Sequence, residues 1–298
     1  MISISIIVVT HNSQKFIEST LDSVFEQDFK ACEVIVIDNA SRDITRDIIK
    51  RKYPQVILVE NPANLGPCQA RNQGITMADG KFILCLDHDV RLSGGFLSTM
   101  HSSIETRDNL GAIGPKILMA DAQTIYSTGI YRSFLRRFYD SGSGEKDPLY
   151  TAKRKKIFGI SAAAALYRKD ALEAIRQGQE YFDADFFYFF EDVDISWRLR
   201  KKGWDIAYLP EAACLHSGGR SRSQDNISQY LCMRNRYWLM IKNEDAIGFL
   251  LFPIIFLFYD LWRNLFMMTT NPGYFFPAFY EAIRLSPKMF RKRALSTD

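Results

Sequence analysis

Two clusters of carboxylates contain the residue types most able to do chemistry. The first is Leu86-Asp87-His88-Asp89-Val90, and the second is the pair Glu191-Asp192. Each cluster directly follows a run of apolar residues. Because apolar runs bury themselves and a buried unpaired carboxylate is costly, such groups usually have a metal, a proton or a cation as partner. The two clusters together predict one site that handles both a metal ion and a proton.

Asp87 and Asp89 have the residue type and spacing of metal ligands. A hard divalent cation prefers oxygen ligands and keeps positions open for phosphate oxygens. Two carboxylates one residue apart can supply one direct ligand and one contact to a ribose or to a metal-bound water. Taken alone, the pair equally fits a solvated loop. His216 follows a short predicted strand, and beside an acidic metal site it becomes a candidate ligand or phosphate contact, although a lone histidine is usually structural.

Glu191 and Asp192 open a predicted helix. Carboxylates are favoured there by the helix dipole, so a purely structural role is one interpretation. The functional interpretation makes one of them a general base that takes a proton from a hydroxyl group. The apolar residues 186–190 just before them would hold the pKa of that base in a useful range.

Two further segments place polar side chains between a strand and a helix. Asp38, in Asp38-Asn39-Ala40-Ser41, could accept a hydrogen bond from a base or a ribose, although turn and N-cap chemistry is the favoured explanation when the segment is taken alone. Arg71 lies in the segment Asn64 to Gly74 and is placed to meet a diphosphate or to pair with a site carboxylate. A surface arginine on a capped helix is the alternative.

The elements that must position these residues alternate between strands and helices. This order predicts a mostly parallel sheet covered by helices on both faces, with ligands bound beyond the carboxyl ends of the strands. Asp38 and Asp87 both end strands, so we expect them at the same edge. The predicted strands are 4–10, 33–38, 56–60 and 81–87, and the predicted helices are 14–27, 43–52 and 68–77.

The pattern loosens in the middle of the chain. Residues 132–156 are rich in Gly, Ser, Lys and Arg, which predicts a loop. A small-residue run, 161–165, precedes a helix that begins near Arg168. A helix over 191–202 and short strands over 204–209 and 213–216 complete this part.

Composition excludes several classes of protein. The net charge of +4 is mild for 298 residues, so we expect no nucleic-acid partner. The five cysteines are scattered and form no CxxC pair, which argues against a zinc ribbon or a disulfide framework. Reduced thiols in a cytoplasmic protein are the simpler interpretation.

The C-terminal quarter begins with a predicted helix, 225–242, followed by Ile247 to Tyr259, which is almost entirely apolar. This segment is shorter than the ~20 residues that a membrane span needs, and it holds Pro253 at its centre. Basic residues at 153–156 and 288–293 could face anionic lipid. We therefore expect a segment at the membrane interface, with a helical hairpin packed on the core as the alternative.

Taken in order, these motifs resemble the family-2 glycosyltransferases of the GT-A fold, most closely the bacterial rhamnosyltransferase-like branch. The resemblance covers roughly residues 1 to 240, and its specificity comes from several modest strings at typical spacing. One departure is His11, which stands where a tyrosine is common in the family. The matching strings are Val8–Asn12, Val36–Ser41, Asn64–Gly74, Leu86–Val90, Phe189–Arg198 and Ala213–Gly218.

The resemblance implies an α/β fold of the GT-A type, with a Rossmann-like, mostly parallel sheet flanked by helices. Residues 1–125 would form the nucleotide-sugar-binding half. Residues 126–224 would form the acceptor-binding and catalytic half of the same domain. Residues 225–298 would be a helical, membrane-associating extension.

The resemblance also implies roles for single residues. Asp192 would be the catalytic base, with Glu191 beside it contacting the acceptor. Asp89, His216 and Asp87 would hold a divalent cation, Mg or Mn. The residues expected to contact the donor nucleotide are Thr10, Asn12, Asp38, Asn64, Gly66, Arg71 and Asp87.

The implied function is an inverting, metal-dependent transfer of a sugar, for which the branch suggests rhamnose. The donor would be a dTDP-, UDP- or GDP-linked sugar, and the acceptor a glycan or lipid-linked glycan in cell-surface polysaccharide synthesis. We expect the protein in the cytoplasm, peripheral at the inner face of the cell membrane. The alternatives are an inactive sugar-nucleotide-binding scaffold and a soluble nucleotidyltransferase, although 10–15 lacks the glycines that a phosphate loop would bring.

Overall fold

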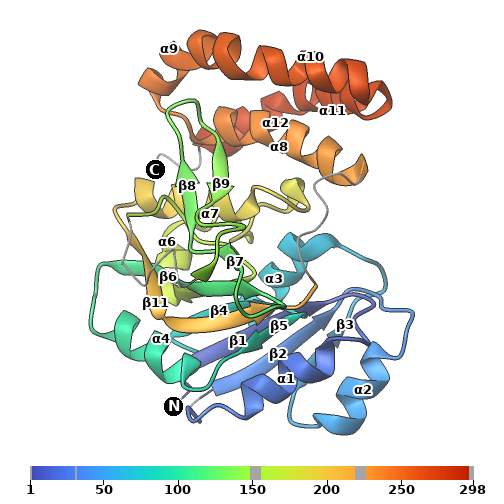
Figure 1. Cartoon of the computed structure of the whole chain (residues 1–298), viewed down its shortest axis with the longest axis vertical. Helices are drawn as coiled ribbons and strands as arrows, with labels where there is room; N and C mark the ends of the chain where they lie inside the picture. Colours follow the sequence, from blue (N-terminus) through green and yellow to red (C-terminus); the bar gives the residue numbers. More distant parts are fainter. Residues whose placement is uncertain (1, 31, 148–155, 219–225, 295–298) are drawn as a thin grey trace.

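The structure is a computed structural model that describes residues 2–30, 32–147, 156–218 and 226–294. Most of the predicted basic cluster at 153–156 and the predicted helix start at Asp225 lie outside these ranges. Figure 1 shows two layers of unequal kind: a sheet flanked by helices below, and a stack of helices above. The two predicted carboxylate clusters belong to the lower layer.

The first half of the chain forms the parallel part of one sheet, as predicted. Its strands follow the order β3-β2-β1-β4, and every neighbouring pair is parallel. Ile and Val occupy both faces of β1, and all seven of its residues are buried, because helices cover the sheet on both sides. The strands are β1 (Ile4–Thr10), β2 (Cys32–Asp38), β3 (Ile57–Glu60) and β4 (Phe82–Asp87).

The helices of this half match the predicted ones within a few residues. Apolar side chains of α1 point into the core at helical spacing, with Ile17, Leu21 and Val24 buried. Gly66 starts α3 with a positive φ of 80°, a conformation that glycine adopts without strain. The helices are α1 (Ile17–Phe25), α2 (Thr45–Lys52) and α3 (Gly66–Met77).

The second half of the sheet is mixed. The strand order continues as β4-β10-β6-β11-β5, with β10 antiparallel to both of its neighbours and β11 parallel to β6. The two short strands predicted over 204–216 are one strand, β11, whose register shifts between Leu209 and Ala213. The strands are β5 (Val90–Leu92), β6 (Leu110–Met119), β7 (Ile125–Ser127), β10 (Ala164–Arg168) and β11 (Asp205–His216).

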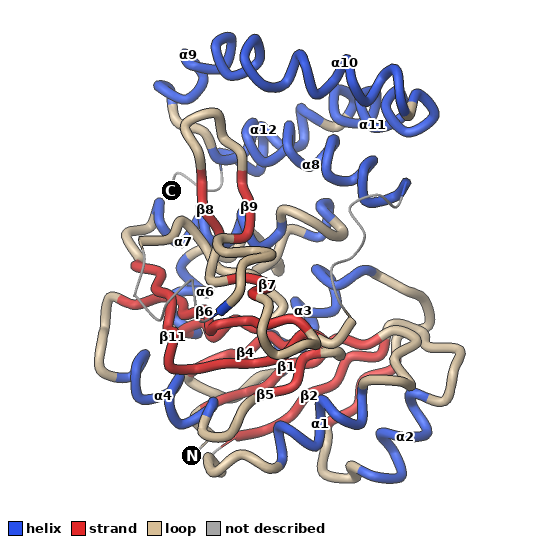
Figure 2. Tube along the Cα trace, viewed as in Figure 1, coloured by secondary structure: helices blue, strands red, loops and turns tan. Residues whose placement is uncertain are grey.

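Two segments of this half differ from the predictions. The alanine run ends in β10, a fully buried central strand, whereas we predicted only a helix after it. The predicted loop over 132–156 contains the end of a hairpin formed by β8 (Ile130–Arg132) and β9 (Phe138–Asp140). Figure 2 shows this hairpin rising from the sheet toward the upper helices. Neither strand has an alternating pattern long enough to identify it in the sequence.

Among the described residues, three helices and a short turn complete the lower layer. The helix predicted over 191–202 is α7, and it ends before Gly203, whose φ is +83°. The elements are α4 (Phe96–Glu105), α6 (Lys169–Ala174), the 3₁₀ turn η1 (Ala184–Phe186) and α7 (Glu191–Lys201).

The upper layer consists of the C-terminal helices. The apolar segment expected to end at Tyr259 continues as one helix of 25 residues, Ala246–Thr270, because neither Pro253 nor Asp260 breaks it. Among the described residues this is the one helix long and apolar enough to cross a membrane, and only 17% of its most apolar window is buried. The elements are α8 (Asn226–Asn243), α9 (Ala246–Ile255), the π turn η2 (Phe256–Asp260), α10 (Leu261–Thr270), α11 (Pro272–Arg284) and α12 (Ser286–Ala294).

Candidate active site

The turn between β4 and β5 holds Asp87 and Asp89. Two hydroxyl side chains of α1 fix this turn: Thr20 donates to the carbonyl of His88 at 2.7 Å, and Ser23 accepts from the backbone N–H of Leu92 at 3.0 Å. The turn is therefore bound at both ends to a helix that is itself packed in the core. Such a fixed backbone gives the two carboxylates defined positions.

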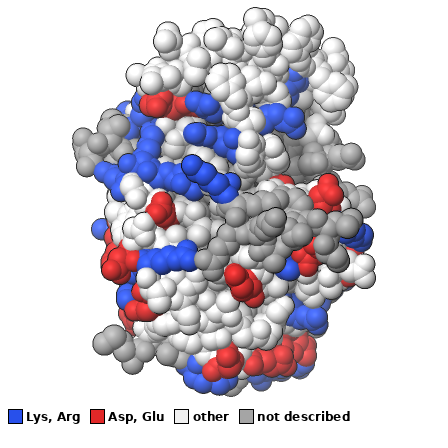
Figure 3. Space-filling model, turned by 60° about the vertical axis from the view of Figure 1, so that its left-hand side comes forward, with Lys and Arg blue, Asp and Glu red and all other residues white. Residues whose placement is uncertain are grey.

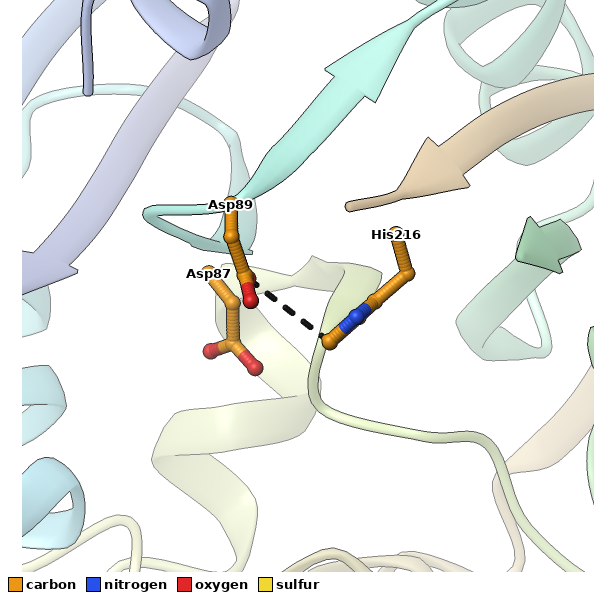
Figure 4. Close-up of side chains that lie close together, drawn as sticks. All are labelled: Asp87, Asp89 and His216. Atoms are coloured by element: carbon orange, nitrogen blue, oxygen red, sulfur yellow. Dashed lines mark ion pairs between the residues drawn. The ribbon is translucent and has the colours of Figure 1, made fainter. Parts of the chain in front are cut away.

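His216 joins the two aspartates at the carboxyl end of β11. One potential ligand atom from each of Asp87, Asp89 and His216 lies within 4.8 Å of the others, and His216 Nε2 is 3.6 Å from Asp89 Oδ1. Figure 4 shows Asp89 and His216 pointing toward one another beside Asp87. The residues come together because β11 pairs with β5, which places His216 opposite Val90.

This cluster fits a divalent cation. Two carboxylates and one imidazole are ligands that Mg or Mn accepts, and three protein ligands leave positions open for phosphate oxygens. The His216 ring stacks on Tyr126, with centroids 4.5 Å apart, which fixes its plane. A Cβ on Gly218 would lie 1.9 Å from Asp89 Oδ2, so only glycine lets the backbone pass this close to the carboxylate.

Arg71 connects the two carboxylate clusters. Its Nη2 lies 2.8 Å from Asp87 Oδ1, and its Nη1 lies 3.1 Å from Glu191 Oε1. The arginine and Glu191 are both buried, so each needs the opposite charge to offset its desolvation. Of the two roles left open for Arg71, the structure therefore has the pairing with site carboxylates.

Asp87, Arg71, Glu191 and Asp192 line one cavity of about 570 Å³. Part of the other walls comes from the apolar run before α7 that the sequence singled out. The lining residues on β7 and on the β8–β9 hairpin were not singled out, because no motif or spacing marks them. The additional polar and aromatic lining residues include Tyr126, Arg137, Asp140, Tyr188, Phe189 and Phe190.

Asp192 is in an environment that favours its protonated form. Burial, together with the neighbouring carboxylates of Glu191 and Asp140, raises the pKa of Asp192 well above the usual aspartate range. Its Oδ1 accepts a hydrogen bond from the backbone N–H of Val193 at 2.8 Å, which stabilises the ionised form but does not reverse the shift. A carboxylate with a raised pKa is a stronger base once ionised.

The aromatic segment before α7 has an unusual backbone. Phe187, Phe189 and Phe190 all have positive φ, between 63° and 66°, a conformation costly for side chains of this size. Asn235 of α8 compensates by donating its amide to the carbonyls of Phe186, Tyr188 and Phe189, at 3.0, 2.8 and 2.8 Å. A buried side chain of the upper layer thus fixes the segment that presents Glu191 and Asp192.

Thr10 and Asp38 lie on adjacent strand ends, paired in register, at the edge that also carries Asp87. Both are fully buried, and the Thr10 hydroxyl and Asp38 Oδ1 have no hydrogen-bond partner in the described structure. A buried polar atom without a partner is costly, so these oxygens suit a polar ligand. Neither residue lines the cavity that holds Asp192.

Asn12, Asn64 and Gly66 shape loops near this edge. Asn12 accepts from the backbone N–H of Arg42 at 2.8 Å, and Asn64 accepts from that of Gly66 at 2.9 Å. The carbonyl of Gly66 accepts from Asn39 at 3.2 Å. These three residues have loop-forming contacts and are not part of the cavity lining.

The model of glycosyl transferase family 2 matches residues 5–176, more than half of the chain. This chain belongs to glycosyl transferase family 2. The match includes β1 to β4, the Asp87–Asp89 turn and β10, and it ends before α7.

Two relatives illustrate the range of the family. The chain is 27% identical over 220 residues to the poly-beta-1,6-N-acetyl-D-glucosamine synthase of Staphylococcus epidermidis, covering 71% of this chain but only 49% of the synthase. The chain thus spans about half the length of that relative. It is 26% identical over 263 residues to the N-acetylglucosaminyl-diphospho-decaprenol L-rhamnosyltransferase of Mycobacterium tuberculosis, covering 81% of this chain and 84% of that one.

Solved structures share the fold. TarS 1-349 of S. aureus in complex with UDP superposes with a TM-score of 0.57 at 21% identity, covering 83% of this chain and 68% of that chain. The mannosyltransferase PcManGT of Pyrobaculum calidifontis, in complex with GDP-Man and Mn2+, gives a TM-score of 0.56 at 16% identity, covering 98% of this chain and 73% of that chain. The predicted GT-A architecture is confirmed by these similarities.

Proposed function

We propose that this protein is an inverting glycosyltransferase that moves a sugar from a nucleotide-diphospho-sugar to a hydroxyl of a glycan or lipid-linked glycan. The observation that carries the proposal is the shared cavity, because Asp87 of the cation cluster and the candidate base Asp192 both line it. A donor held at one and an acceptor at the other would meet inside it. Residues 1–125 would then bind the donor, and 126–224 would supply the acceptor side.

The donor diphosphate would bind at the cation cluster. Asp89, His216 and Asp87 would hold Mg or Mn there, and the unpartnered Thr10 hydroxyl and Asp38 Oδ1 would take the nucleoside. When bound, the cation supplies positive charge that offsets the negative charge developing on the departing nucleoside diphosphate. Arg71 would keep Asp87 and Glu191 in place beside it.

Asp192 would carry out the proton transfer. The acceptor hydroxyl gives its proton to the Asp192 carboxylate while its oxygen forms a bond to the anomeric carbon. The bond from that carbon to the diphosphate oxygen breaks on the opposite side, and its electron pair leaves with the diphosphate. Attack opposite to the leaving group inverts the configuration, and one base on the acceptor side is enough for it.

The sugar and the setting are also proposals. The named rhamnosyltransferase relative supports rhamnose as the sugar and a lipid-linked acceptor, and both relatives support a role in cell-surface polysaccharide synthesis. The exposed apolar helix in the extension 225–298 supports a position at the inner face of the cell membrane.

The test compares wild type with Asp192→Asn and Asp89→Ala. Calorimetry with dTDP, UDP and GDP and their sugar conjugates, with and without Mn, identifies the donor, and product formation measures transfer. Asp192→Asn should bind the donor normally and lose about 10²–10⁴-fold in turnover. Asp89→Ala should lose the metal-dependent part of donor affinity.

Two results would contradict this assignment. Unchanged turnover in Asp192→Asn would remove Asp192 from the role of base. Donor binding by wild type without any transfer to any acceptor would favour the inactive sugar-nucleotide-binding alternative.

A further inference from the structure

A second cavity, of about 560 Å³, lies between β8 and α7 and shares no lining residue with the active-site cavity. Four cationic side chains and three aromatic rings make up most of its lining. A cavity with this composition suits an anion, because the rings limit hydration while the cations supply charge. These seven residues are Arg132, Lys156, Arg200, Lys201, Tyr131, Phe158 and Trp197.

The four cations form no ion pair with a carboxylate within the described residues. The guanidinium of Arg132 lies over the rings of Phe158 and Trp197, 4.7 and 5.2 Å from their centroids. Arg200 donates to the backbone carbonyls of Phe158 and Ile157, at 2.5 and 2.7 Å. The aromatic walls and the backbone therefore orient Arg132 and Arg200, and Asp205 acts on Arg200 only at a distance.

Nearby acidic groups are engaged elsewhere. Glu244 and Asp245 act on Arg132 at a distance, but Glu244 pairs with Arg136 and Asp245 caps α9 at the N–H of Gly248. Burial, followed by the charge of Arg136, lowers the pKa of Arg132, as expected where like charges gather. An anion in the cavity would relieve this repulsion.

The cavity lies beside the apolar upper layer. In the face shown in Figure 3, a band rich in Lys and Arg, with some Asp or Glu at its upper border, runs beneath a cap that is almost entirely uncharged, at the height of β8, α7 and α8 in Figure 1. Large apolar side chains of this cap are exposed at intervals of four residues. They are Leu250, Ile254, Phe258, Trp262 and Phe266.

The underside of the same helix is held to α8 by polar contacts. Asp260 is fully buried and pairs with Arg236 at 2.5 Å, and Asn264 donates to the Tyr237 hydroxyl at 2.6 Å. The helix thus lies lengthwise on the protein, with two polar contacts to α8 on its buried side and large apolar side chains on its exposed side. Such a helix rests in the plane of a lipid interface, where cations at its border meet the headgroups.

We propose that the basic cavity binds the phosphate of an anionic phospholipid while the apolar face of α9 and α10 rests in the membrane. This site is separate from the transferase site and does not depend on the reaction proposed for it. A bound headgroup would fix the orientation of the protein relative to the membrane plane, because an apolar face alone does not select one orientation.

Vesicle co-sedimentation tests the proposal by comparing the full wild-type chain with the double variant Lys156→Ala/Lys201→Ala. Both lysines are exposed and without ion pairs in the described structure, so folding should be unaffected, as thermal unfolding will check. On phosphatidylcholine vesicles containing phosphatidylglycerol, the variant should bind on the order of tenfold more weakly than wild type. On pure phosphatidylcholine the two should bind equally.

A matched control removes two other exposed lysines that form no ion pair in the described structure, Lys15 and Lys30. The variant Lys15→Ala/Lys30→Ala should bind anionic vesicles as wild type does. Equal binding of both double variants to anionic vesicles would overturn the proposal. So would a loss of binding by the Lys156/Lys201 variant on pure phosphatidylcholine vesicles. Free inorganic phosphate is the other source of the same anion. Its binding in calorimetry together with unchanged vesicle binding of the Lys156/Lys201 variant would overturn the lipid assignment.

Light scattering separates the membrane from a second copy as the occupant of the apolar face. A monomer that binds vesicles supports the proposal. A stable dimer that binds no vesicles overturns it. Transfer to a soluble acceptor should be equal in wild type and the Lys156/Lys201 variant, so a failure of the proposed transferase activity would leave the vesicle results unaffected.

Discussion

The pKa of Asp192 is set by its burial and by the charges around it. Burial and the carboxylates of Glu191 and Asp140 raise its pKa, while Arg71 opposes the shift only as the smallest of these influences. Arg71 is already paired with Asp87 and Glu191, so little of its charge remains for Asp192. The result is a carboxylate that gains a proton more readily than an ordinary aspartate.

We predict that the acid limb of turnover lies above the usual aspartate pKa. A base must be ionised, so the rate should fall as pH drops through the raised pKa of Asp192. The measurement is turnover against pH at saturating donor and acceptor. An acid limb at or below the ordinary aspartate range would contradict this reading of the site.

Glu191→Gln provides the matched comparison. Removing this negative charge should lower the pKa of Asp192 and move the acid limb to lower pH, whatever happens to the maximal rate. Glu105→Gln removes an exposed carboxylate of α4, outside the cavity, and should leave the limb in place.

The site residues could be predicted from the sequence where a motif and a strand end coincide. Asp87, Asp89 and His216 come together as expected, because β4 and β11 end and β5 begins at one edge. The double pairing of Arg71 could not be predicted, since it depends on which carboxylates the fold brings within reach. Tyr126 was missed because it is a single tyrosine in a short strand without a motif.

At the scale of elements, α8 is joined to the segment before α7. Asn235 is completely buried, and its amide serves three carbonyls of a backbone that carries three aromatic residues at positive φ. Arg234 adds bonds to the carbonyls of Asp185 and Phe186, at 3.0 and 3.1 Å. A helix outside the region that the family model matches thus sets the position of Asp192.

We predict that Asn235→Ala lowers kcat by about tenfold while donor affinity stays unchanged. The substitution leaves three carbonyls without their donor, which allows the strained segment to relax and Asp192 to move. Turnover and nucleotide calorimetry measure the two effects separately. Asn264→Ala removes a side-chain hydrogen bond in the upper layer, away from this segment, and should change neither.

Helices and strands could be predicted where their apolar residues recur at regular spacing. The strands and helices of the first half have regular apolar patterns and were found within a few residues. The central strand β10 begins in an alanine run, and alanine has little strand preference, so its place depends on the neighbours β4 and β6. The continuation of the helix past Tyr259 was missed because Asp260 interrupts the apolar run, whereas in the fold this carboxylate is paired with Arg236 of α8.

At the scale of the whole molecule, buried charges join the upper layer to the lower one. Arg236 of α8 binds Asp260 and the backbone carbonyls of Leu135 and Arg136 at the hairpin tip. Arg136 in turn pairs with Glu244, before α9. The hairpin, α8 and the long apolar helix therefore form one connected unit above the cavity.

We predict that Asp260→Ala lowers the free energy of unfolding by about 3–5 kcal/mol, because it leaves the buried guanidinium of Arg236 without its counterion. Urea unfolding followed by fluorescence measures the loss. The double variant Arg236→Met/Asp260→Leu replaces both charges by apolar groups and should recover most of it. If the double variant were less stable than Asp260→Ala, the pair would have another function than mutual neutralisation.

The π turn Phe256–Asp260 decides which way the two halves of the long helix face. Apolar side chains recur every four residues from Leu250 to Phe266, and four residues of an α-helix overshoot a full turn by about 40°. The π turn has more residues per turn, so it reduces this accumulated rotation midway along the helix. Deleting one residue here would rotate α10 by about 100° relative to α9. The number of residues in the π turn, and not composition alone, thus keeps the apolar side chains on a single face of the 25-residue helix.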